Sequence, residues 1–151
     1  IFFNNSAENG VGGAILLTDY STASWNSETI FTTNTANAGG GVYIHRKSTA
    51  NFNGKTTFAA NAASTGQGGA LAVLYSDVYL RDKKSFVDNT AISSGGAVAV
   101  IATISASDPT FSGNRATIAG GAIFMWGNHL GPHFIGVRFV SNFASQGGGI
   151  Y

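Results

Sequence analysis

Residues 58–71, Phe-Ala-Ala-Asn-Ala-Ala-Ser-Thr-Gly-Gln-Gly-Gly-Ala-Leu, contain the two motifs that decide the fold. In the first, an aromatic residue is followed three positions later by asparagine. In the second, a glycine pair is followed by a small residue and an aliphatic one. Both motifs occur six times, and the second glycines of the pairs are separated by 27, 29, 27, 25 and 27 residues. The chain is therefore an array of repeats of about 27 residues.

The motifs run the length of the chain. The aromatic and asparagine positions are Phe2/Asn5, Phe31/Asn34, Phe58/Asn61, Phe86/Asn89, Phe111/Asn114 and Phe139/Asn142. The glycine pairs are Gly12-Gly13, Gly39-Gly40, Gly68-Gly69, Gly95-Gly96, Gly120-Gly121 and Gly147-Gly148.

The composition of the repeat favours strands over helices. Helical repeats are usually longer and rich in Ala, Leu, Glu and Lys, whereas this unit is rich in Gly, Ser, Thr, Asn and Val. Each unit contains three short segments with alternating character: one that ends in Phe-x-x-Asn, one that follows the glycine pair, and one between them, as in residues 50–53 or 78–80. Stacked copies would pair each strand with its equivalent one repeat along, about 4.8 Å away. The sequence thus predicts an all-β parallel β-helix with three strands per coil, and five coils would form a rod of roughly 24 Å.

Each motif residue has an expected structural role. The phenylalanines should point inward and stack in the core. The asparagines should lie at sharp turns, where they tolerate a left-handed backbone or hydrogen-bond amide to amide along the rod. The glycine pairs should form a second corner, where positive φ or a close approach between coils excludes a Cβ. A phosphate-binding loop is the alternative for the glycines, but no pair is followed by Lys-Ser/Thr or by a helix signal.

The Phe-x-x-Asn motif followed by Gly-Gly-Ala-Ile/Val/Leu resembles the repeat of the polymorphic outer-membrane proteins of chlamydiae. That resemblance covers nearly all of residues 1–151 and implies a right-handed β-helix of the pectin-lyase-like type in a secreted surface adhesin. Similar repeats also occur in large surface proteins of algae and other protists. Members of the chlamydial family commonly carry cysteines, whereas this chain has none, and no β-barrel translocator segment is visible. Because pectate lyases and polygalacturonases share the broad fold, an enzyme is an alternative to test.

Composition and charge narrow the function further. The 151 residues are 44% hydrophobic and 12% aromatic, which excludes disorder, and only 10% are charged, with a net charge of +1. We therefore expect neither nucleic acid nor an anionic membrane surface as a partner. The absence of cysteine excludes disulfides and thiolate sites, and no apolar run is long enough to span a bilayer. Because the chain begins and stops within a repeat, we expect residues 1–151 to form a single β-helix segment of a longer array, with five coils plus a partial sixth.

Groups that could carry chemistry are few. The acids occupy different positions of the repeat, and only Asp77, Asp82 and Asp88 share one coil, where a solvated corner explains them better than catalysis or calcium binding. The pair His129 and His133 has a zinc-like spacing, but an intervening Gly-Pro argues for a loop insertion. We therefore expect no catalytic residue, no metal and no cofactor. The sequon that begins at Asn4 is a candidate glycosylation site.

The strand after each glycine pair has apolar residues on both faces. Alternation also places Ala72 and Ala99 on the outward face. The candidate interface on this face comprises Leu16, Tyr43, Leu74, Ile101, Phe124, Trp126 and Tyr151. Such an apolar face usually contacts a protein partner, a neighbouring copy or another domain. The alternative is that another part of the chain covers it, or that it tolerates scattered apolar groups.

These observations together predict a non-enzymatic β-helix scaffold, extracellular or on the cell surface, that acts in adhesion or protein–protein assembly. A structural subunit of a filament or large complex is the second hypothesis. A carbohydrate-binding or polysaccharide-cleaving β-helix is the third, with host or cell-surface glycans as ligands.

Overall fold

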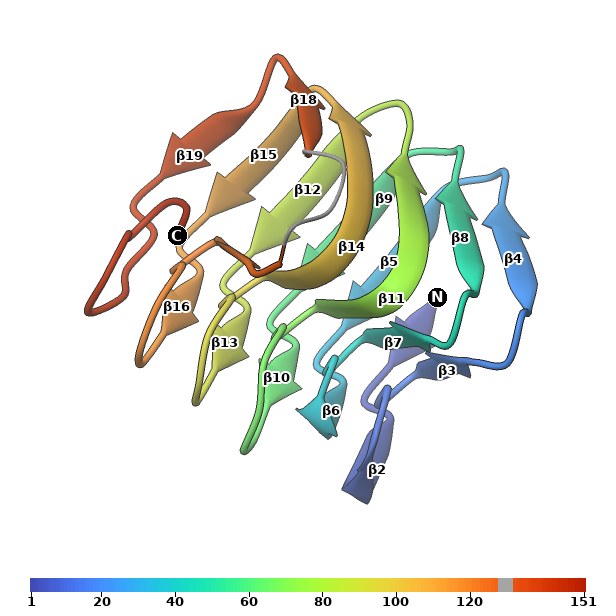
Figure 1. Cartoon of the computed structure of the whole chain (residues 1–151), viewed down its shortest axis with the longest axis horizontal. Helices are drawn as coiled ribbons and strands as arrows, with labels where there is room; N and C mark the ends of the chain where they lie inside the picture. The colour runs from blue at the N-terminus through green and yellow to red at the C-terminus, as the bar shows by residue number, and fades with distance from the viewer. Residues whose placement is uncertain (128–131) are drawn as a thin grey trace.

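The computed structural model describes residues 1–127 and 132–151, and these form parallel sheets that wind into a rod of about five coils (Figure 1). Equivalent strands pair in parallel with a sequence offset of about 27 residues, as between Phe31 and Phe58. This confirms the predicted all-β parallel β-helix. Among the described residues there is no helix long and apolar enough to cross a bilayer.

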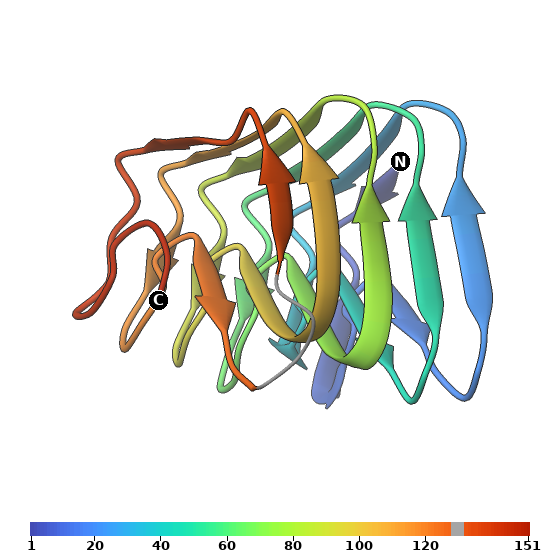
Figure 2. The same cartoon turned by 45° about the horizontal axis from the view of Figure 1, so that its top comes forward.

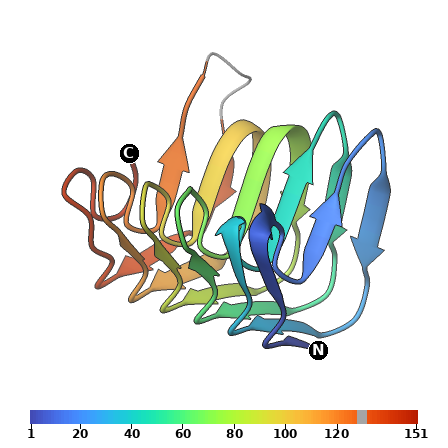
Figure 3. The ribbon, with the colours of Figure 1, turned by 90° about the horizontal axis from the view of Figure 1, so that it is seen from below.

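Sheet A contains the Phe-x-x strands. Its order is β1 (Phe2–Phe3), β5 (Thr29–Thr32), β9 (Thr56–Ala59), β12 (Lys84–Val87), β15 (Pro109–Ser112) and β19 (Arg138–Val140). All five pairings are parallel and place the phenylalanines opposite one another. Seen from below, sheet A forms one long side of the rod (Figure 3).

Sheet B follows the asparagine in each coil. Its order is β2 (Ser6–Val11), β6 (Thr35–Ala38), β10 (Ala62–Ala63), β13 (Thr90–Ala91) and β16 (Arg115–Ala116). The sequence did not predict these strands, because three of them have only two residues and are too short for an alternating pattern.

Sheet C contains both of the remaining predicted segments. Its first arm is β3 (Ile15–Leu17), β7 (Val42–His45), the beginnings of β11 (Leu71–Leu80) and β14 (Val98–Ser107), and β17 (Ile123–Met125). Its second arm is β4 (Thr22–Trp25), β8 (Thr49–Phe52), the ends of β11 and β14, and β18 (His133–Ile135). The expected division into two separate strands is therefore wrong for β11 and β14, which run through the corner as single curved strands (Figure 2).

The core lies inside the coils. Phe31, Phe58, Phe86 and Phe111 are fully buried, as are the inward aliphatic residues that follow the glycine pairs, such as Val42 and Leu71. Trp25 stacks on Phe52 in the second arm of sheet C, with ring centroids 4.4 Å apart, and both rings meet Phe31 edge to face. The core is therefore built from columns of equivalent side chains.

Candidate functional site

The phenylalanines of sheet A form a continuous stack. Successive ring centroids lie 4.7, 4.8, 4.8, 4.7 and 5.3 Å apart from Phe2 to Phe139, and the rings are nearly parallel. This spacing matches the distance between strands, so each ring sits directly on the next. The stack is a structural element and offers no chemical group to a ligand.

The asparagines form a hydrogen-bonded ladder beside that stack. Each Nδ2 group donates to Oδ1 of the asparagine in the next coil, at 2.8 to 3.0 Å, from Asn5 through Asn142. The same Oδ1 also accepts the backbone N–H of the preceding coil's asparagine, as Asn89 does from Asn61 at 3.0 Å. The second Nδ2 hydrogen of Asn89 is donated to the carbonyl of Phe58. A buried asparagine in the ladder thus uses its full capacity of two donors and two acceptor positions.

The left-handed backbone lies one residue earlier than expected. Asn34, Asn61, Asn89 and Asn114 are not among the positive-φ residues; instead, the preceding positions are, for example Ala60 with φ of 53°. The asparagine is therefore required for its side-chain amide and not for its tolerance of the turn. Asn4, the candidate glycosylation site, occupies the equivalent turn position with φ of 54° and is exposed.

The two glycines of each pair perform different tasks. The first has positive φ, as in Gly68 at 69°. The second has no room for a side chain, because a Cβ on Gly69 would lie 2.1 Å from the carbonyl oxygen of Gly96 in the next coil. Both expected reasons for glycine therefore apply, one at each position.

The apolar outer face of sheet C is interrupted at its centre. The outward residues Ala72 and Ala99 are 0% and 1% exposed, because the preceding glycine turn packs against them. A Cβ on Gly68 would lie 3.0 Å from the backbone nitrogen of Ala72. Part of the expected outward column is thus covered by its own coil.

The candidate interface residues lie on either side of this covered strip. Leu16, Trp126 and Tyr151 are exposed, while Tyr43, Leu74, Ile101 and Phe124 are half-buried. Leu74 and Ile101 are paired in register on neighbouring coils. Phe124 and Tyr151 are stacked with centroids 5.8 Å apart, and with Trp126 they line a shallow cleft of about 400 Å³.

A second aromatic cluster occupies the corner between the two arms of sheet C. Tyr20 and Tyr75 are strongly exposed, at 74% and 58%. The Lys47 ammonium lies 5.7 Å from the Tyr20 ring centroid, and the ring centroids of His45 and Tyr75 are 6.2 Å apart. This cluster was not predicted from the sequence, because Tyr20 lies between strands and Tyr75 has positive φ at the corner within β11, where the alternating pattern is interrupted.

The acidic residues are distributed differently from the expectation. Glu28, Asp82 and Asp108 all lie at the corner that leads into sheet A, and so they do not occupy separate edges. Lysines separate them in the stack: Glu28, Lys55, Lys83 and Asp108 occupy equivalent positions in successive coils. Within residues 1–127 and 132–151, no group of three His, Cys, Asp or Glu residues could hold a metal ion. His129 lies outside the described residues, and His133 is exposed at the beginning of β18.

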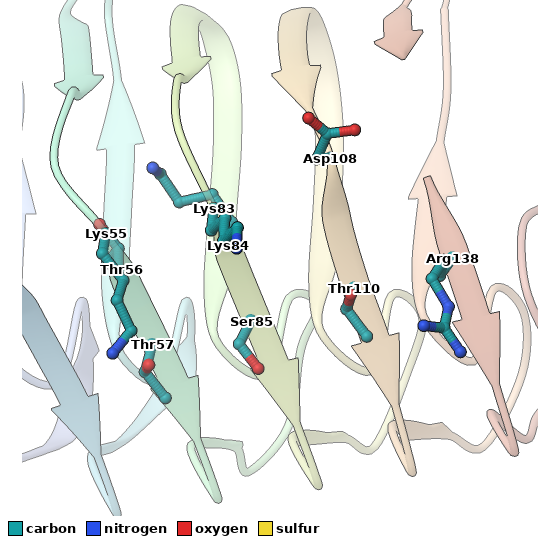
Figure 4. Close-up of a pocket in the computed structure, with 9 residues that line it drawn as sticks. All are labelled: Lys55, Thr56, Thr57, Lys83, Lys84, Ser85, Asp108, Thr110 and Arg138. Atoms are coloured by element: carbon teal, nitrogen blue, oxygen red, sulfur yellow. The ribbon is translucent and has the colours of Figure 1, made fainter. Parts of the chain in front are cut away.

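The same corner opens into a groove along the outside of sheet A (Figure 4). The groove has a volume of about 460 Å³ and is lined by cations and hydroxyls. The lining residues are Lys55, Thr56, Thr57, Lys83, Lys84, Ser85, Asp108, Thr110 and Arg138. The groove could not be predicted from the sequence, because its residues are distant in the chain and none belongs to a motif.

Lys84 is the unusual residue of the groove. It is only 2% exposed and occupies an inward position that is threonine in the two preceding coils. Its Nζ donates to the carbonyl of Gly54 at 2.9 Å and to the carbonyl of Arg81. Burial lowers the pKa of Lys84 to about 8, and the nearby Asp82 carboxylate opposes that shift.

Comparison with known proteins identifies the repeat. A family model described as the Chlamydia polymorphic membrane protein repeat matches residues 110–125. That segment includes Phe111, Asn114 and the pair Gly120-Gly121. It covers most of β15 and all of β16 and β17. Searches of curated proteins and of solved structures returned no significant match. The chain therefore carries a repeat of this type folded as coils of a parallel β-helix, and over this segment it is similar to the polymorphic membrane proteins.

Proposed function

We propose that this chain is a non-enzymatic scaffold at the cell surface that acts in adhesion or protein–protein assembly through the outer face of sheet C. The observation that carries the proposal is the paired, half-exposed Leu74 and Ile101 on neighbouring coils. Leu74 also pairs in register with His45 of the preceding coil. Leu74 and Ile101 lie between the cluster that contains Phe124, Trp126 and Tyr151 and the cluster that contains Tyr20 and Tyr75.

The outer face of sheet C carries side chains of the kinds that are common in protein interfaces. Tyrosine, tryptophan and phenylalanine are enriched in protein interfaces, and Tyr43, Phe124, Trp126 and Tyr151 all contribute to this side of the rod. A rigid parallel sheet presents these groups at a fixed spacing, so a partner binds without ordering the scaffold first.

The test replaces both central residues by lysine, as Leu74→Lys with Ile101→Lys. Beads coated with the variant should adhere to a cell layer at least about tenfold less than beads with the native chain, because two charges would be buried in the contact. The matched control is Val87→Lys with Ser112→Lys, a register pair of half-exposed residues on sheet A.

The result separates adhesion from self-assembly. Loss of adherence in the sheet C variant alone supports the proposal, and equal adherence of both variants contradicts it. If sedimentation shows that native chains associate laterally and the sheet C variant does not, this face serves in assembly between copies.

A further inference from the structure

The fold gathers the cations that are scattered in the sequence. Of the eight lysines and arginines, five lie at the corner between sheet C and sheet A. These are Lys55, Arg81, Lys83, Lys84 and Arg138, contributed by the second, third and fifth coils. The near-neutral net charge of the chain therefore conceals a local excess of positive charge.

Two of these cations, Lys83 and Arg138, are available to a ligand. Lys55 is paired with Glu28 at 2.7 Å. Within the part of the chain that the structure describes, Lys83 and Arg138 have no carboxylate within ion-pair distance, and both are exposed. The ammonium group of Lys84 adds positive charge beneath the groove, where its field is less screened by water.

A column of hydroxyls lies in the same groove as Lys83 and Arg138. Thr57, Ser85 and Thr110 are in register on successive strands, and Arg138 continues the same column. All three hydroxyl residues are half-exposed on the outer face (Figure 4). Since each coil advances by about 4.8 Å, the groove runs roughly 14 Å along the rod from Lys55 to Arg138.

We propose that this groove binds an extended acidic polysaccharide, with carboxylate or sulfate groups held by Lys83 and Arg138 and sugar hydroxyls held by the Thr57, Ser85 and Thr110 column. Guanidinium binds such anions through two parallel hydrogen bonds. The alternating donors and acceptors of the hydroxyl column suit a hydroxyl-rich chain that lies along the axis. The carboxylate of Asp108 lies between the two exposed cations, so it favours a ligand whose charges are spaced apart.

The groove is less suited to nucleic acid. Among the residues that the structure describes, no aromatic side chain lines the groove, so these residues offer no stacking platform for single-stranded bases. A DNA duplex carries one charge per about 1.7 Å, which far exceeds the cations available along this length. This proposal concerns a different face of the rod from the scaffold function and does not depend on it.

The experiment measures binding of the whole chain to defined probes at low ionic strength by calorimetry. The acidic probes are heparin oligosaccharides, which carry sulfates, and oligogalacturonates, which carry carboxylates. Maltooligosaccharides, a single-stranded DNA oligomer and polyglutamate test the neutral glycan, nucleic acid and acidic peptide alternatives. The groove variant is Lys83→Gln with Arg138→Gln. Its matched control is Arg46→Gln with Lys47→Gln, which removes the same charge from exposed residues at the other corner.

We expect one or both acidic oligosaccharides to bind, with affinity that falls as salt rises. The groove variant should bind roughly tenfold more weakly or worse, and the control should stay within about twofold of the native chain. Preference for heparin or for oligogalacturonate then distinguishes sulfate from carboxylate ligands. The proposal is overturned if neither acidic oligosaccharide binds, if both variants lose affinity equally, or if maltooligosaccharide, DNA or polyglutamate binds as tightly.

Discussion

The asparagine ladder shows how a single residue type specifies the stacking of coils. Asn61 and Asn89 are fully buried, yet every polar atom of their side chains is hydrogen-bonded. Aspartate at the same position lacks the two amide donors and would bury a charge. The ladder therefore requires asparagine specifically, and it holds neighbouring coils in one register.

Replacing Asn89 by alanine should destabilise the rod by about 3 kcal/mol or more. The change leaves the Asn61 backbone N–H, the Asn61 amide and the Phe58 carbonyl without their partners, and each unsatisfied buried group costs about 1–3 kcal/mol. Urea unfolding followed by circular dichroism gives the free energy of unfolding. Asn26→Ala is the control, since Asn26 is exposed and accepts one hydrogen bond from Asn53. Equal losses in the two variants would contradict this role for the ladder.

Lys84 gives the rod a predictable dependence on pH. Below about pH 8 the lysine is protonated in the folded and unfolded chains, so the folded state carries the desolvation cost of the charge. Between about pH 8 and the ordinary value of 10.5 the folded chain has lost this proton while the unfolded chain retains it. The contribution of Lys84 to stability therefore rises with pH across this range.

The comparison with Lys84→Met isolates that contribution from other titrating groups. We expect the methionine variant to be at least as stable at pH 7, because replacing a buried charge with an apolar group of similar volume is often neutral or stabilising. The stability of the native chain relative to the variant should then increase from pH 8 to pH 10.5. Unfolding curves across this range measure the difference, and a constant difference would show that the Lys84 charge is not desolvated.

At the scale of the element, the glycine corners set how closely the coils approach. The first glycine supplies the left-handed turn, and the second lies against backbone atoms of the next coil. Backbone atoms cannot move aside as the end of a flexible side chain can. The corner therefore tolerates no side chain at the second glycine, whatever its polarity.

Gly69→Ala should destabilise the fold by at least about 1–3 kcal/mol, because overpacking against fixed atoms forces the backbone to shift. Its added Cβ would lie 2.1 Å from the Gly96 oxygen and 2.4 Å from the Thr90 oxygen. Gly10→Ala is the matched control, since a Cβ there meets only the Ala7 methyl at 3.5 Å. Thermal unfolding of both variants provides the measurement. A melting temperature unchanged in Gly69→Ala would contradict the close approach.

At the scale of the whole molecule, the strand pairings of the described residues join each coil to the coils next to it. The strand pairs of sheet A link β5 to β9, β9 to β12, and β12 to β15 in turn. The stability of such an array is roughly the sum of the free energies of its individual coils and of the interfaces between neighbouring coils. A substitution in one coil should therefore destabilise mainly that coil and its neighbours.

Phe58→Ala tests this locality. Removing the ring should cost about 3–5 kcal/mol, because Phe58 is fully buried between Phe31 and Phe86 and leaves a cavity. Hydrogen exchange should accelerate most in β5, β9 and β12, and least in β19. Phe3→Ala is the control, since Phe3 is 65% exposed. Uniform acceleration in every coil would instead show that the rod opens as a single cooperative unit.

The repeat made much of this architecture predictable from sequence. Phe58, Asn61 and Gly69 each recur at one position of every coil, and a side chain that repeats with the coil must form a column. The sequence pattern did not predict the short strands of sheet B or the residues with a left-handed backbone. The two-residue strands of sheet B have no period to detect, and the left-handed position falls on residues as varied as Thr33, Ala60 and Asp88.

The surfaces depend on tertiary structure for a different reason. Exposure of Ala72 and Ala99 was expected from alternation, but a neighbouring turn covers them, and alternation carries no information about such cover. Lys83 and Arg138 occur two coils apart and in no common motif, so only the winding of the chain places them in one groove. The sequence by itself thus determined the coil and its ladders, because those contacts repeat. Only the tertiary structure decided which faces are open and where charge collects, because those properties arise from residues that differ between coils.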